Sequence, residues 1–245
     1  MMGSATNPLR PEHFETASRT HVGMVRETNE DRVLVQPQSG LWAIADGMGG
    51  HSLGDRAAAL VVSALSPITP SEPRVRKALE SANASIRAMG RKAEVTCGST
   101  VAGLSLSPGH CFVFWVGDSR VYRLREERLT RLTRDHSFVQ ELRDAGVLTD
   151  VQARSDPRGN IITRAVGIAD DVAVDFMPID VRDDDLYLIC SDGLSDLVDD
   201  AMLLGLLDRR QAEESAEKLI RAALAAGGTD NISLTIITVN REFNG

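Results

Sequence analysis

Short apolar segments follow one another closely along much of this 245-residue chain, and they constrain its fold more than any other feature. Each is four to nine residues long, which is typical of a β-strand. The predicted strands cover residues 31–36, 41–45, 98–106, 111–116, 121–124, 172–176, 186–190 and 232–239. The third, fourth and fifth are separated only by the turn-like segments 107–109 and 117–119, which predicts an antiparallel meander.

Amphipathic helices are predicted between and after these strands. Apolar residues recur at helical spacing in four segments, residues 53–65, 73–92, 201–207 and 212–226. The strands come in adjacent runs and the helices in separate groups. This order favours an α+β fold, with antiparallel sheets covered by helices, over a doubly wound parallel sheet.

The domain organisation follows from length and composition. We expect residues 1–13 to form a loose tail and residues 14–245 to form one domain, since this length suits a single large core. Residues 137–165 are polar and mixed, and we expect them to form a small insertion against the main body.

Charge and cysteine content narrow the class of partner. The net charge of -8 argues against nucleic acid and anionic membrane as partners. No apolar run is long enough to span a membrane, and residues 1–10 lack a secretory core. The three cysteines, Cys97, Cys111 and Cys190, are interpreted as free thiols in a reducing compartment, so we expect a cytoplasmic protein.

Four aspartates share one local setting, in which an apolar strand meets a turn. Asp46 follows the strand at 41–45 and precedes a glycine-rich stretch. Asp118 and Asp192 likewise follow apolar strands, whereas Asp230 precedes one. A carboxylate at a strand end is held by rigid backbone at the rim of a sheet, where several such groups can converge.

Converging carboxylates suit hard divalent cations such as Mg²⁺ and Mn²⁺, which prefer oxygen ligands. Two such ions about 3.5–4 Å apart can activate water for attack on phosphorus. The alternative is structural, because Asp-Gly pairs such as Asp46–Gly47 and Asp192–Gly193 are also common in turns. The spacing alone indicates an oxygen-ligand metal site without deciding its chemistry.

Arg26 stands in a polar, acidic stretch just before the strand at 31–36. Its planar guanidinium suits bidentate capture of a phosphate group. A surface ion pair with Glu30 is the alternative. Arg26 alone does not decide between the two.

Taken together, these segments resemble the metal-dependent protein phosphatases of type 2C, particularly the compact bacterial members. The matching motifs occur in family order and cover residues 17–239. They are Arg26–Asp31, Asp46–His51, Gly98–Thr100, Val116–Arg120, Asp135–His136 with Gln140–Leu142, Ile162–Gly167, Ser191–Gly193 and Thr229–Asn231.

The resemblance implies a four-layer αββα sandwich with two central antiparallel sheets. It also implies two core ions of Mn²⁺ or Mg²⁺, with Asp46 bridging them and the Gly47 carbonyl binding one. Asp192 and Asp230 would bind the other ion, and Glu30 would support the first through water.

Further roles follow from the same resemblance. Asp118, with Asp192, would help to hold a third, weaker ion, and Arg26 would clamp the phosphate. Residues 137–165 would form a flap beside the site where protein substrates dock. The implied activity is hydrolysis of phosphoserine and phosphothreonine in proteins, opposing a Ser/Thr kinase that is itself a partner. We expect a monomer.

Two positions depart from the family pattern. Many eukaryotic relatives carry a histidine, assigned as general acid, where this chain has Met48, as in many bacterial members. Methionine cannot donate a proton, so the general acid stays unassigned. His51 is nearby, but just before a helix it is interpreted as a packing or capping residue. The flap often carries His-Pro where this chain has Asp156–Pro157, which bears on flap charge and substrate preference.

One further histidine and the two tryptophans are interpreted as structural residues. We expect His136 to anchor the flap and Trp42 and Trp115 to lie in the core.

Two other functions stay open. One is a catalytically weak regulator that binds phosphoproteins with the same fold. The other is a phosphatase acting on small phosphate esters.

Overall fold

Two antiparallel sheets lie face to face in the computed structural model, which describes residues 13–49, 53–107, 109–154 and 156–240. The first sheet has the order β1-β11-β10-β7-β8. Its strands are β1 (Phe14–His21), β11 (Ile232–Val239), β10 (Leu186–Cys190), β7 (Arg120–Arg125) and β8 (Arg128–Arg131). The expected tail of residues 1–13 falls almost entirely outside the described residues, since β1 begins at Phe14.

The second sheet has the order β2-β3-β5-β6-β9, and a short strand β4 pairs with the end of β3. Its strands are β2 (Asp31–Gln36), β3 (Leu41–Met48), β4 (Gly98–Ser99), β5 (Val101–Ser107), β6 (His110–Val116) and β9 (Asp175–Pro178). Every strand pair in both sheets is antiparallel.

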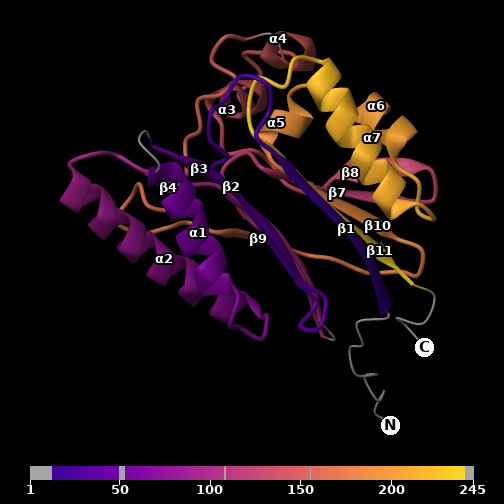
Figure 1. Cartoon of the computed structure of the whole chain (residues 1–245), viewed down its shortest axis with the longest axis horizontal. Coiled ribbons are helices and arrows are strands. Elements are labelled where there is room, and N and C mark those ends of the chain that lie inside the picture. The colour runs from indigo at the N-terminus through magenta and orange to yellow at the C-terminus, as the bar shows by residue number, and fades with distance from the viewer. Residues whose placement is uncertain (1–12, 50–52, 108, 155, 241–245) are drawn as a thin grey trace.

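Helices cover the outer faces of the two sheets, as Figure 1 shows. The second sheet is covered by α1 (Leu53–Leu65) and α2 (Glu72–Ala93), and the first by α5 (Asp192–Ser195), α6 (Asp200–Leu206) and α7 (Ala212–Ala225). Two further helices, α3 (Phe138–Asp144) and α4 (Asp150–Arg154), lie in the segment predicted to be the flap. The predicted αββα sandwich is confirmed.

The alternation of side chains along each strand produces three apolar layers. In β3, Leu41, Ala43 and Ala45 face the α1–α2 layer, whereas Trp42 and Ile44 face the other sheet. The layer between the sheets also holds Trp115, so both tryptophans are core residues as predicted. No helix within the described ranges has the length and hydrophobicity needed to span a bilayer.

The predicted meander is wrong beyond its first hairpin. Strands β5 and β6 pair as expected, but β7 joins the other sheet, where it pairs with β10 and β8. The chain crosses between the sheets at Gly117, whose φ of +104° lies in the region that favours glycine. A Cβ at this position would lie 2.6 Å from the Thr100 side chain, so the crossing also needs the space that glycine leaves.

The ends of the other predicted helices and strands differ only slightly from those in the structure. The four predicted helices agree with α1, α2, α6 and α7 to within a residue or two. The strand predicted at 172–176 runs instead over Asp175–Pro178, because Val172 and Val174 are used to pack against the α1–α2 layer. The strands β1 and β8 and the helices α3, α4 and α5 were not predicted as separate elements.

Candidate metal centre

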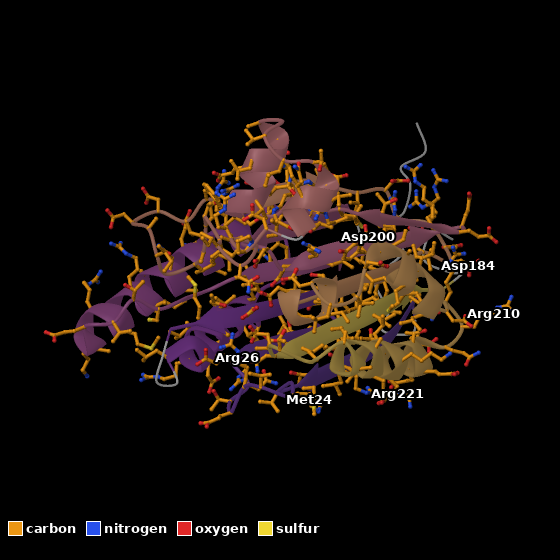
Figure 2. The ribbon with its side chains drawn as sticks, turned by 90° about the horizontal axis from the view of Figure 1, so that it is seen from above. Met24, Arg26, Asp184, Asp200, Arg210 and Arg221 are labelled. Atoms are coloured by element: carbon orange, nitrogen blue, oxygen red, sulfur yellow. The ribbon has the colours of Figure 1, made fainter. Side chains whose placement is uncertain are left out.

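The predicted aspartates come together at one end of the two sheets. Figure 2 shows Arg26 near this end, whereas Asp184, which precedes β10, lies at the other end. Burial raises the pKa of Asp46 well above its ordinary value, and the charges of Asp192, Asp31 and Asp118 raise it further. Burial likewise raises the pKa of Asp192, and Asp118, Asp230 and Asp31 contribute. These effects show that the carboxylates share one local environment.

Asp31 belongs to this group, although the sequence motif gave it no separate role. It lies directly opposite Asp46 in the pairing of β2 with β3, and it is 2% exposed. Ser191 donates a hydrogen bond to its Oδ2 at 2.8 Å, while Oδ1 is buried without a partner. Burial raises the pKa of Asp31 to about 6 against the lowering effect of its serine partners.

The two Asp-Gly pairs are not turns. Asp46 and Gly47 lie inside β3, and Asp192 and Gly193 begin α5. A Cβ at Gly47 would lie 2.0 Å from the Gly54 carbonyl oxygen. A Cβ at Gly193 would lie 2.0 Å from the Asn231 carbonyl oxygen. Both glycines therefore permit close backbone packing beside an aspartate, which decides against the turn interpretation.

Thr100, which lies between β4 and β5, fixes the backbone of Asp46. Its Oγ1 accepts a hydrogen bond from the Asp46 N–H at 3.2 Å, and its own N–H donates to the Asp46 carbonyl at 2.8 Å. The same hydroxyl lies 2.7 Å from Ser119 Oγ, next to Asp118. Thr100 thus joins the two segments that carry Asp46 and Asp118.

Arg26 is paired with Asp230 and not with Glu30, the partner considered from the sequence. Its Nε and Nη2 donate to the two carboxylate oxygens of Asp230 at 3.0 and 2.6 Å. Both side chains are partly exposed. The pairing places a guanidinium beside the aspartate cluster, and it raises the pKa of Arg26.

Asn231 organises the loop that carries Arg26. Its Nδ2 donates to the carbonyls of Val22 and Thr28, at 2.8 and 2.9 Å, and its Oδ1 accepts from the Glu30 N–H at 2.8 Å. The Glu30 carboxylate lies against Gly54 at the start of α1. Burial raises the pKa of Glu30. The motif position of Asn231 was the only sequence signal for its role.

Asp118 is buried next to the flap. Burial raises its pKa to about 7, with further contributions from Asp135 and Asp196. His136 lies beside it and contacts Gly117 and Trp115, which places it as a flap anchor, as predicted. His51 lies outside the described residues.

The cysteines take no part in this centre. All three are free, and Cys97 and Cys190 are buried while Cys111 is half-buried. Burial raises the pKa of Cys190 to about 12 and that of Cys111 to about 11, which keeps both in the unreactive thiol form.

The donor set fits hard divalent cations. In the described parts of the chain, no three His, Cys, Asp or Glu side chains already surround a common point as a metal-binding group. However, Asp31, Asp46, Asp118 and Asp192 are carboxylates with raised pKa values, and Asp31 and Asp192 each have a buried oxygen without a partner. Positive charge would relieve their repulsion, and oxygen ligands of this kind suit Mg²⁺ and Mn²⁺.

Comparisons with known proteins agree with this site. A family model described as protein phosphatase 2C matches residues 18–227. The serine/threonine protein phosphatase PstP of Mycobacterium tuberculosis is 36% identical over 231 residues. That match covers 91% of this chain but 44% of PstP, so the chain spans about half the length of this relative.

Solved structures show the same fold. PppA of Pseudomonas aeruginosa, described as a key regulatory component of T6SS, superposes with a TM-score of 0.86 at 35% identity. The match covers 95% of this chain and 100% of PppA. The catalytic domain of PstP in complex with two manganese ions superposes with a TM-score of 0.79 at 34% identity, covering 93% and 98% of the two chains. With its αββα sandwich and its ordered motifs, the chain belongs to the protein phosphatase 2C family.

Proposed function

We propose that this chain is a metal-dependent phosphatase that hydrolyses phosphoserine and phosphothreonine in proteins. The convergence of Asp46, Asp118 and Asp192 at one end of the sheets carries the proposal, because the charges of Asp192 and Asp118 raise the pKa of Asp46 and the charge of Asp118 also raises the pKa of Asp192. Family membership and the two manganese ions in the PstP catalytic domain support it.

The proposed metal ligands follow the family roles. Asp46 would bridge two core ions of Mn²⁺ or Mg²⁺, with the Gly47 carbonyl on one of them and Asp192 and Asp230 on the other. Asp118 would serve a third, weaker ion, and Glu30 would act through water. When bound, the core ions supply positive charge and an activated water for in-line attack on phosphorus.

Protein side chains would bind the phosphate and hold the carboxylates of the centre in place. Arg26 is the proposed phosphate clamp, since its guanidinium already makes a bidentate pair with a carboxylate at the site and the same geometry suits phosphate. Thr100 and Ser191 hold Asp46 and Asp31 in place. Met48 cannot donate a proton, so no side chain is assigned as general acid.

We further propose that the protein acts in the cytoplasm as a monomer and opposes a Ser/Thr kinase. The three free cysteines suit a reducing compartment.

Phosphate release from a phosphothreonine peptide tests the proposal against its two alternatives. The purified protein is assayed with Mn²⁺, with Mg²⁺ and with a chelator, on the peptide and on a free sugar phosphate. We expect divalent-ion-dependent cleavage of the peptide and much slower cleavage of the sugar phosphate. The opposite preference would show a small-ester phosphatase, and binding of the peptide without turnover at saturating Mn²⁺ would show a regulator.

A further inference from the structure

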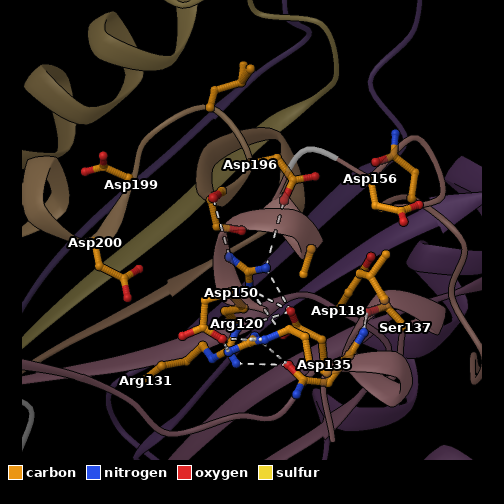
Figure 3. A pocket seen from close by; sticks show the side chains of 18 of the residues that line it. Asp118, Arg120, Arg131, Asp135, Ser137, Asp150, Asp156, Asp196, Asp199 and Asp200 are labelled. Carbon is orange, nitrogen blue, oxygen red and sulfur yellow. Dashed lines mark hydrogen bonds and ion pairs between the residues drawn. The ribbon is translucent and has the colours of Figure 1, made fainter. Parts of the chain in front are cut away.

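A cavity of about 520 Å³ lies between the flap and the segment containing α5 and α6. Its flap side is formed from α3, α4 and the residues that follow them, and its other side from Ser195 to Met202. Asp118 also lines the cavity, which therefore adjoins the candidate metal centre. Figure 3 shows Asp199 and Asp200 well separated from Asp118, with Arg120 between them in this view.

The positive charges in the cavity are neutralised by neighbouring protein groups. Arg120 makes a bidentate pair with Asp135, with distances of 2.8 to 3.1 Å, and Arg131 donates to the same carboxylate at 3.2 Å. Arg143 is paired with Asp150. These arginines thus have carboxylate partners of their own, which leaves them poorly suited to attract an anionic ligand.

The carboxylates of the α5–α6 side are not neutralised in this way. Asp200 is exposed and makes no hydrogen bond or ion pair with any described residue. Asp199 caps α6 by accepting the Met202 N–H at 2.8 Å, which leaves its charge uncompensated. Asp196 lies 3.9 Å from Arg120, which is already bound to Asp135. This side therefore carries excess negative charge.

Ser195 provides an independent sign that the cavity accepts a ligand. The residue is 9% exposed and lines the cavity. Its hydroxyl is buried and has no hydrogen-bond partner among the described residues. A buried polar group without a partner is costly, and a bound donor would satisfy it.

We propose that this cavity binds a basic side chain, arginine or lysine, that flanks the phosphorylated residue of a protein substrate. The inference rests on the proposed function, since it places the phosphoresidue at the metal centre and the flanking residue beyond Asp118. The cation would lie between Asp196, Asp199 and Asp200, and its N–H groups could donate to the Ser195 hydroxyl.

Asp156 is unsuited to the same role. It lines the cavity, but both of its carboxylate oxygens accept hydrogen bonds from Arg158, at 2.8 and 2.7 Å. Its charge is therefore compensated within the flap.

The test uses phosphothreonine peptides in which arginine, alanine or glutamate is placed at each residue flanking the phosphothreonine. With the full chain and saturating Mn²⁺, we expect kcat/KM for arginine to exceed that for alanine by about tenfold at one or two positions, with glutamate below alanine. The preference should shrink at high salt, because part of the site is exposed.

Two variants test whether the preference for arginine arises from the cavity. In Asp199→Asn/Asp200→Asn the cap of α6 is retained, since asparagine caps as well as aspartate, and the arginine preference should fall to about twofold or less. Asp200→Lys should favour the glutamate peptide. The matched control, Glu126→Gln/Glu127→Gln, removes two exposed charges from the opposite end of β7 and should keep the wild-type preference.

The outcomes separate this inference from the proposed function. Equal cleavage of arginine and alanine peptides at every position, or a preference for glutamate, would overturn the inference while leaving a working phosphatase. An arginine preference that survives in Asp199→Asn/Asp200→Asn would also overturn it. Absence of cleavage for every peptide would overturn the proposed function itself.

Discussion

His136 accepts a hydrogen bond from the backbone N–H of Gly117, with 3.1 Å between its Nδ1 and the amide nitrogen. The backbone N–H of His136 donates in return to the Gly117 carbonyl at 2.9 Å. Since Nδ1 is the acceptor, Nε2 carries the proton and donates to Asp175 at 3.1 Å. His136 therefore ties the flap to the crossing that presents Asp118.

Replacing His136 should weaken this connection. In His136→Ala the buried Gly117 N–H loses its partner, so we expect the free energy of unfolding to fall by about 1–3 kcal/mol, measured by urea denaturation. Turnover should fall as well, because Asp118 is held less firmly. His110→Ala, an exposed residue at the start of β6, is the control and should match the wild type. Wild-type stability in His136→Ala would contradict the proposed anchor.

The charge of Asp31 should lower the free energy of unfolding when no divalent ion is bound. Its carboxylate is buried without a directly paired cation, so Asp31→Asn should raise the free energy of unfolding in chelator by about 1–2 kcal/mol. The same change should reduce the stabilisation that Mn²⁺ provides, because the centre loses a negative charge. Asp135→Asn is the matched contrast, since Asp135 is also buried but is paired with Arg120 and Arg131, and it should destabilise. A destabilising Asp31→Asn would show that its charge is compensated.

Stability without metal and the stabilisation that Mn²⁺ provides should depend on pH in opposite ways. The pKa values of Asp31 and Asp118 are raised by burial, to about 6 and about 7, above those of the unfolded chain. Their protonation favours the folded state, so without divalent ions stability should fall as pH rises from about 4, near the pKa of an unfolded aspartate, to about 7. Mn²⁺ binds the deprotonated carboxylates, so the gain in Tm on adding Mn²⁺ should grow over the same range. A gain that is constant with pH would argue against binding at these groups.

Arg26 and Asp230 make a bidentate pair with each other, although Arg26 is the proposed ligand of phosphate and Asp230 is a proposed ligand of a metal ion. Arg26→Ala should lower kcat/KM for a phosphothreonine peptide by about ten- to a hundredfold, through loss of a charge-assisted contact. Mn²⁺ should bind at least as tightly as in the wild type, because Asp230 is released, and calorimetry measures this directly. Arg210→Ala, far from Arg26 in Figure 2, is the control. Weaker Mn²⁺ binding in Arg26→Ala would assign Arg26 to orienting Asp230 and not to holding phosphate.

The layers of the fold could be predicted because each strand and helix carries its own apolar pattern. The choice of sheet for each strand could not. The segment Gly117–Ser119 has the composition of a hairpin turn, yet it crosses from one sheet to the other. That choice depends on pairing with β10, which lies far along the chain and leaves no local signal.

In the site, too, residues with a local sequence signal could be predicted, whereas contacts between distant segments could not. Asp46, Asp118, Asp192 and Asp230 stand out beside apolar strands, and ordered motifs linked them. Asp31 resembles the polar start of an alternating strand, and only its pairing opposite Asp46 reveals a buried carboxylate. The partner of Arg26 was likewise hidden, because Asp230 is 204 residues away whereas Glu30 is nearby.

Mn²⁺ binding and phosphate release, measured on the same preparations of the wild type, Asp46→Ala and Asp192→Ala, test the metal-dependent mechanism most directly. The wild type should bind two ions per chain tightly and cleave a phosphothreonine peptide only when Mn²⁺ is present. Both variants should bind less Mn²⁺ and lose turnover by several orders of magnitude, while Glu127→Gln, which is exposed and far from the centre, should resemble the wild type. Wild-type rates of peptide cleavage in either aspartate variant would contradict the two-metal assignment.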